Sequence, residues 1–133
     1  MKSGDTILAR THAELIRKLL NNKLLYCYKC TYDLNDTTFL WLVCLDDTDN
    51  DGHKNKFESE DTIIERFDKQ RAKDGRFYHG LKKEYRLVFE KIQTVNGRIY
   101  KFHGLYKLDK VEDNEYLRTL KRVSTEYKFA LEL

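Results

Sequence analysis

The chain contains no proline and only six glycines among its 133 residues. Proline averages about 5% of protein sequences, so its absence excludes proline-rich linkers and leaves the turns to glycine, asparagine and aspartate. Three cysteines cannot all pair within one chain, which argues against a disulfide scaffold and indicates a reducing, cytoplasmic setting. The sequence also lacks an apolar run near the roughly 18 residues of a membrane helix, and its first residues show no secretory signal or transit peptide.

Large apolar side chains and charges of both signs are plentiful instead. Hydrophobic residues make up 41% and charged residues 35%, which indicates one folded domain over residues 1–133. Residues 1–70 carry 10 basic and 13 acidic side chains, net −3, whereas residues 71–133 carry 15 and 9, net +6. A basic half suits an anionic partner, most commonly nucleic acid. An ordinary solvated surface explains the same charges, so both interpretations stay open.

Local patterns predict two short helices and at least five strands. Thr11 and Glu14 form a capping-box pattern before a helix that ends at Asn21, and residues 59–61 open a second helix that continues to Phe67. Strands are predicted over residues 24–32, 37–45, 85–94, 99–108 and part of 116–129, with a basic loop over 70–80. This mixture indicates an α+β fold with a small curled antiparallel sheet or barrel and two or three short peripheral helices.

The dipeptide Asn96-Gly97 is the strongest hairpin signal in the chain, because both residues tolerate positive φ. A two-residue turn there pairs Val95 with Arg98 and places Phe89 opposite Gly104. The glycine would then leave space for the phenyl ring.

Residues 47–58 match the calcium-loop pattern D-x-[DN]-x-[DN]-G-x5-E in full. The ligands would be the side chains of Asp47, Asp49, Asp51 and Glu58 and the carbonyl oxygen of His53. The preceding segment is strand-like rather than helical, and no second such loop occurs. A calcium site and a solvated Asp/Asn turn are both open interpretations.

No residue spacing indicates catalysis. The four histidines are scattered, and the Cys27-x-x-Cys30 pair lies in a strand pattern, where residues three apart point to opposite faces. We therefore predict a chain that is not an enzyme and needs no cofactor apart from the calcium considered above. A protein-interaction or adaptor domain is a further alternative.

The segment Phe102-His103-Gly104-Leu105-Tyr106, with strand 85–89 before it, resembles the paired strands of SRA domains, also called YDG domains. These are modified-cytosine readers of the PUA-like superfamily, and their second strand typically reads Tyr-Asp-Gly-Leu-Tyr. The likeness covers about a third of the chain, and His103 replaces the acidic residue. The chain ends, residues 10–15 and 120–124, are also similar to small uncharacterised bacterial proteins.

The SRA resemblance implies a PUA-like β-barrel that binds double-stranded DNA in a bacterial restriction or defence system. In such proteins a flipped base stacks in an aromatic pocket. The resemblance nominates Tyr32, Trp41, Phe77, Tyr78 and Tyr100 as stacking residues, with core packing favoured for Trp41. It nominates Lys73, Arg76, Lys82, Lys83, Arg98 and Lys101 as phosphate contacts and adds His103 to the nucleic-acid-binding set.

Overall fold

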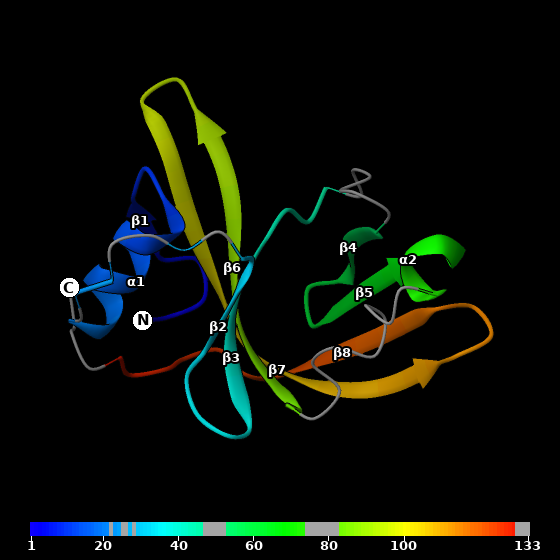
Figure 1. Ribbon diagram of the computed structural model, residues 1–133. Helices are drawn as coiled ribbons and strands as arrows, with labels where there is room; N and C mark the ends of the chain where they lie inside the picture. The colour runs from blue at the N-terminus through cyan, green and yellow to red at the C-terminus, as the bar shows by residue number, and fades with distance from the viewer. Residues whose placement is uncertain (22, 25–26, 28, 47–52, 74–82, 130–133) are drawn as a thin grey trace.

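The computed structural model describes the chain except residues 22, 25–26, 28, 47–52, 74–82 and 130–133 (Figure 1). Its elements in chain order are β1 (Thr6–Leu8), α1 (His12–Leu20), β2 (Thr31–Asp33), β3 (Thr38–Val43), β4 (His53–Ser59), β5 (Thr62–Phe67), α2 (Lys69–Lys73), β6 (Tyr85–Thr94), β7 (Gly97–Glu112) and β8 (Leu117–Ser124). None of the described helices is long and apolar enough to cross a membrane.

One eight-stranded sheet holds the fold together, in the order β2-β3-β6-β7-β8-β5-β4, and β1 pairs with β7 beside this path. The predicted all-antiparallel sheet is wrong at its centre, where β3 and β6 are parallel. Parallel neighbours need a long crossover, and residues 44–84, which include β4, β5 and α2, supply it. The barrel stays a prediction, since the end strands β2 and β4 do not pair with each other among the described residues.

Helix α1 begins and ends as its sequence predicts. The Thr11 hydroxyl accepts a hydrogen bond from the Glu14 amide at 3.1 Å, and the Glu14 carboxylate accepts one from the Arg10 amide at 2.8 Å. Asn21 ends the helix in the left-handed conformation, with φ of 51°. The helix buries Leu15 and the other apolar residues of its stripe against the sheet.

The helix predicted to follow residues 59–61 is wrong, because residues 62–67 form strand β5. Ile63, Glu65 and Phe67 are buried, whereas Ile64 and Arg66 between them are more exposed. This is the two-residue period of a strand, and the β-branched residues suit it. Farther on, the predicted basic loop begins with the five-residue helix α2.

Apolar side chains form two main cores, one on each face of the sheet. In β3 Leu40 and Leu42 pack under α1, and Phe39, Trp41 and Val43 pack on the opposite face. We call the first the α1 core and the second the inner core. The prediction that this strand is covered on both faces is confirmed, since every residue of β3 is buried.

The turn between β6 and β7 lies one residue earlier than predicted. Thr94 pairs with Gly97, so Val95 and Asn96 form the turn. The Thr94 hydroxyl accepts from the Asn96 amide at 3.2 Å and donates to the Gly97 carbonyl at 2.6 Å. Asn96 is not among the residues with positive φ, whereas Gly97 has φ of +124°. The threonine hydroxyl therefore closes the turn, and the predicted pairing with Arg98 is wrong.

A β-bulge divides β7 into two halves. Phe89 pairs with Phe102, but Val88 pairs with Gly104, so His103 is the extra residue of the bulge. The predicted pairing of Phe89 with Gly104 is therefore wrong. The bulge also reverses the side-chain alternation of β7. Phe102 lies in the α1 core, whereas Tyr106 lies in the inner core.

Candidate functional site

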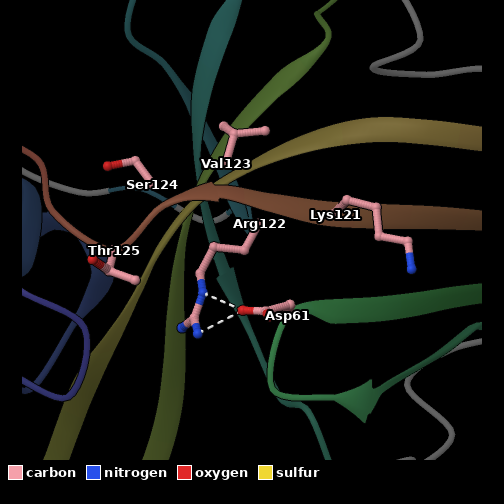
Figure 2. Close-up of a pocket in the computed structure, with 6 residues that line it drawn as sticks. All are labelled: Asp61, Lys121, Arg122, Val123, Ser124 and Thr125. Carbon is pink, nitrogen blue, oxygen red and sulfur yellow. Dashed lines mark hydrogen bonds and ion pairs between the residues drawn. The ribbon is translucent and has the colours of Figure 1, made fainter.

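A shallow pocket lies where the end of β8 passes the turn between β4 and β5 (Figure 2). Its volume is about 410 Å³, and its lining residues are Asp61, Lys121, Arg122, Val123, Ser124 and Thr125. Nη2 of Arg122 lies 2.7 Å from the Asp61 carboxylate, and Nζ of Lys121 donates to the Thr62 hydroxyl at 2.9 Å. The pocket is broadly open, so it suits contact with a surface better than enclosure of a small ligand.

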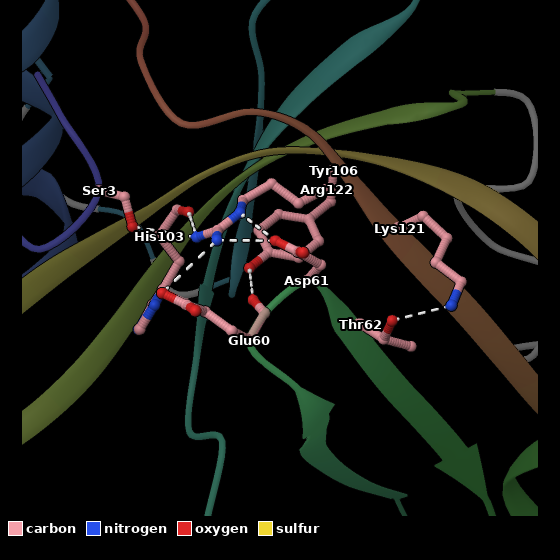
Figure 3. Close-up of polar contacts among 8 residues, drawn as sticks. All are labelled: Ser3, Glu60, Asp61, Thr62, His103, Tyr106, Lys121 and Arg122. Carbon is pink, nitrogen blue, oxygen red and sulfur yellow. Dashed lines mark hydrogen bonds and ion pairs between the residues drawn. The ribbon is translucent and has the colours of Figure 1, made fainter.

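Arg122 joins three separate parts of the chain (Figure 3). Besides Asp61 in the β4–β5 turn, its guanidinium donates to the Ser3 hydroxyl and to the His103 carbonyl, each at 3.1 Å. Only 9% of the Arg122 side chain is exposed, so these are charge-assisted hydrogen bonds in a partly dry setting. The guanidinium therefore fixes the β7 bulge to the N-terminal segment and to the β4–β5 turn.

Tyr106 connects the bulge to the same turn from the inner core. Its hydroxyl donates to the Glu60 carbonyl at 3.1 Å, and its ring is fully buried. Burial raises the pKa of this hydroxyl to about 12, because the phenolate would lose its hydration.

The raised pKa of Tyr106 predicts a loss of stability in alkali. Below pH 10 the hydroxyl is protonated in both states, so it adds no pH dependence; between pH 10 and about 12 only the unfolded state ionises. The free energy of unfolding should fall by about 3 kcal/mol across this window through Tyr106 alone. Urea unfolding of the wild type and of Tyr106→Phe at pH 9, 10 and 11 measures the first half of this fall, about 1.4 kcal/mol, with the other tyrosines cancelling in the difference. Parallel pH profiles of the two proteins would contradict it.

The bulge gives His103 a defined position. Its Nε2 lies 2.9 Å from the Glu90 carboxylate, and its ring meets the Phe57 ring edge-on at 4.8 Å between centroids. His103 and Glu90 are thus held together on the inner face, beside the Arg122 contacts.

Two arginines and one glutamate form a buried triad on the inner face. Nη1 of Arg86 in β6 donates to the Glu65 carboxylate at 3.0 Å, and Nε of Arg118 in β8 lies 3.2 Å from the same oxygen. At most 6% of each side chain is exposed. The triad carries one net positive charge, and burial is the main reason why the pKa of Arg118 falls to about 10.

Aromatic rings surround the triad. The Arg86 guanidinium lies 4.6 Å from the Trp41 ring centroid and 5.1 Å from that of Phe39, and Arg118 lies 4.7 Å from that of Phe67. These cation–π contacts partly replace the lost hydration. Nε of Arg86 has no hydrogen-bond partner in the described part of the chain.

The nominated binding residues that the structure describes do not form one surface. Lys83 donates from Nζ to the Asn35 carbonyl at 2.6 Å, in the loop before β3. Tyr100 is fully buried in the α1 core, so neither face of its ring is available for stacking. Arg98 donates to the Tyr100 hydroxyl at 3.4 Å, and Lys101 lies opposite Glu90.

The other nominated residues divide into two groups. Trp41 is buried beside Arg86, as favoured from the sequence, and Tyr32 is half-buried in β2. Lys73 ends α2. The positions of Arg76, Phe77, Tyr78 and Lys82 lie outside the described residues.

The predicted calcium loop is described only at its end. Asp47, Asp49 and Asp51 lie outside the described residues, His53 begins β4, and Glu58 is exposed in the same strand. Within the described ranges no group of three His, Cys, Asp or Glu side chains is placed to hold a metal ion. The calcium site stays a prediction.

Sequence reasoning did not identify the triad or Arg122. A signal was present in β8, where Arg118, Leu120 and Arg122 alternate with more exposed residues. That alternation places all three on the buried face of a strand. An arginine on such a face needs a buried acceptor, and Glu65 occurs at the equivalent buried position of β5.

The fold and this site define a mostly β-stranded domain whose curled sheet encloses a basic, aromatic-lined cluster on one face. The family model "SRA: SET and RING associated domain" matches residues 1–129. The chain therefore belongs to the SRA family. The resemblance seen in the β6–β7 hairpin is confirmed, and it extends over nearly the whole chain instead of a third.

Among solved structures, "The 5-Hydroxymethylcytosine-Specific Restriction Enzyme AbaSI" is similar, with a TM-score of 0.75 and 16% sequence identity. The match covers 95% of this chain and 40% of that chain. At this identity the likeness shows a shared fold. No curated protein matches the sequence.

Proposed function

We propose that this domain binds double-stranded DNA and reads a modified cytosine, as part of a restriction or defence system. The family match over residues 1–129 carries the proposal. The similar fold of an enzyme specific for 5-hydroxymethylcytosine supports this choice of base.

The inner face supplies chemistry that suits such a ligand. A base displaced from the duplex loses its stacking and needs aromatic or guanidinium planes together with hydrogen-bond donors. The triad holds two guanidinium groups beside Trp41, Phe39 and Phe67, and all of these side chains are more than nine-tenths buried. In our proposal they therefore support the base pocket from beneath and do not stack on the base themselves.

The proposed role is recognition without catalysis. The chain spans 40% of the similar restriction enzyme. In our proposal DNA cleavage belongs to a separate nuclease part, and this domain selects the site.

The test is DNA affinity measured with three duplexes that differ only at one cytosine: unmodified, 5-methylated and 5-hydroxymethylated. We expect a modified duplex to bind about tenfold tighter or better, because one specific base contact is worth about 1–3 kcal/mol. Affinity for all three should fall steeply between about 50 and 200 mM salt.

Tyr78, nominated from the sequence, offers a matched pair of variants. Tyr78→Ala should weaken binding of the modified duplex by about 1–3 kcal/mol if a base stacks on the ring, whereas Tyr78→Phe should retain binding. Equal wild-type affinity for modified and unmodified duplexes would refute base reading. Absence of binding at low salt would refute the whole proposal.

A further inference from the structure

The face of β4, β5, β7 and β8 opposite the inner core carries a cluster of cations. Ile63, Glu65 and Phe67 point inward from β5, so Arg66 points outward, and the strand pairing places Lys54 beside it. The outer basic face, as we define it, consists of Lys54, Lys56, Arg66, Lys107, Lys110 and Lys121. In Figure 1 α1 lies on the far side of the β6–β7 hairpin from β4 and β5, and it does not cover this face.

Like charges stand directly opposite each other on the outer basic face. Lys54 pairs with Arg66 across β4 and β5, and Lys107 pairs with Lys121 across β7 and β8. Such pairs destabilise a sheet. Carboxylates lie near two of these cations: Glu112 is 2.7 Å from Nζ of Lys110, which Asp109 and Glu115 also approach, and Asp61 lines one pocket with Lys121. Within the described ranges, the other four cations form no ion pair with a carboxylate. An excess of positive charge therefore remains for an external anion.

We propose that the outer basic face binds the phosphate backbone of a second DNA segment, independently of base reading. Its cations occupy four adjacent strands and are mostly exposed, which suits an extended polyanion. Five of the six are lysines, a residue depleted from protein–protein interfaces but common at DNA phosphates. The inner and outer faces are opposite sides of one sheet, so a straight duplex contacts only one of them. The domain would then hold two DNA segments at once.

The test is a double variant, Lys54→Glu and Lys107→Glu. Each glutamate faces a cation, Arg66 or Lys121, so the variant exchanges two repulsive pairs for attractive ones and should remain folded. We expect its affinity for an unmodified duplex to fall about tenfold near 100 mM salt. The slope of log K against log salt should become shallower by about two.

The control is Lys29→Glu with Lys128→Glu, which makes the same change in net charge at two exposed lysines away from this face. An equal loss of affinity in the control would overturn the proposal, because net charge would then explain the effect.

Stoichiometry separates this inference from base reading. By native mass spectrometry with short duplexes at low salt, the wild type and the control should bind two duplexes per chain and the outer-face variant one. The variant should keep any preference for modified cytosine. Loss of that preference would show that both faces belong to a single DNA-binding site, which would contradict an independent outer site. A single duplex per wild-type chain would overturn the second DNA site, and so would binding of polyglutamate at this face in preference to DNA. Either result would hold whatever the outcome of the base-reading test.

Discussion

Replacing Glu65 with alanine is expected to lower the free energy of unfolding by about 3–5 kcal/mol. The substitution leaves the Arg86 and Arg118 guanidinium groups side by side, each about 2% exposed, without the carboxylate between them. Two buried like charges repel strongly, and neither has water to replace the lost partner. Urea unfolding at neutral pH measures the change.

An exposed residue of the neighbouring strand provides the control. Glu58→Ala should change stability by less than about 0.5 kcal/mol, because the side chain is exposed. A Glu65→Ala loss no larger than this would show that the triad adds nothing to stability.

Removing the whole triad separates stability from function. Replacing Glu65 with leucine and both arginines with methionine should recover most of the stability, since apolar residues of similar volume often replace buried ion pairs without loss. Under the proposed function this folded variant should lose its preference for modified cytosine. Retained preference would place base reading elsewhere in the domain.

Gly104→Ala is expected to lower the free energy of unfolding by about 2–4 kcal/mol. Gly104 has φ of +121°, and a Cβ there would collide with the Ser124 carbonyl of β8 and lie 3.0 Å from Cδ of Arg122. The strand β8 would have to move away from the bulge, which would also disturb the Arg122 contacts to Ser3 and His103.

A substitution at Gly4 separates the two causes of the expected loss at Gly104, namely the collision of the new Cβ with β8 and the strain of a positive φ. It also has positive φ, +99°, but a Cβ there would meet nothing within 4 Å. Gly4→Ala should therefore cost only the backbone strain, about 1–3 kcal/mol, and less than Gly104→Ala. Equal losses at the two glycines would contradict the close approach of β7 and β8.

Short-range signals predicted local elements better than their pairing. The capping pattern at Thr11 and the apolar run of β3 depend on neighbouring residues, and the structure has both elements. The helix predicted after residues 59–61 was wrong, because Ile63 and Phe67 share a face at either helical or strand spacing. Pairing of β5 with β4 and β8 decides between them, and no local pattern contains that information.

The candidate site was harder to predict because its residues come from distant strands. The hairpin motif placed His103 and Gly104 in the second strand of the hairpin, but the bulge changed their partners and moved Tyr106 to the opposite face. Dividing the charge along the sequence also hid the outer basic face. Lys54 and Arg66 belong to the acidic half of the sequence, yet the sheet places them on the same face as lysines of the basic half.

The parallel pairing of β3 with β6 sets an order for folding. The strands β6, β7 and β8 follow one another closely, so we expect them to pair early, whereas β3 and β5 must close long loops before they dock. Arg86 and Arg118 both belong to the early unit, and Glu65 arrives with β5. We therefore expect their repulsion to oppose collapse of the early unit until the hairpin of β4 and β5 is in place, so that the inner face becomes complete only in the last steps of folding.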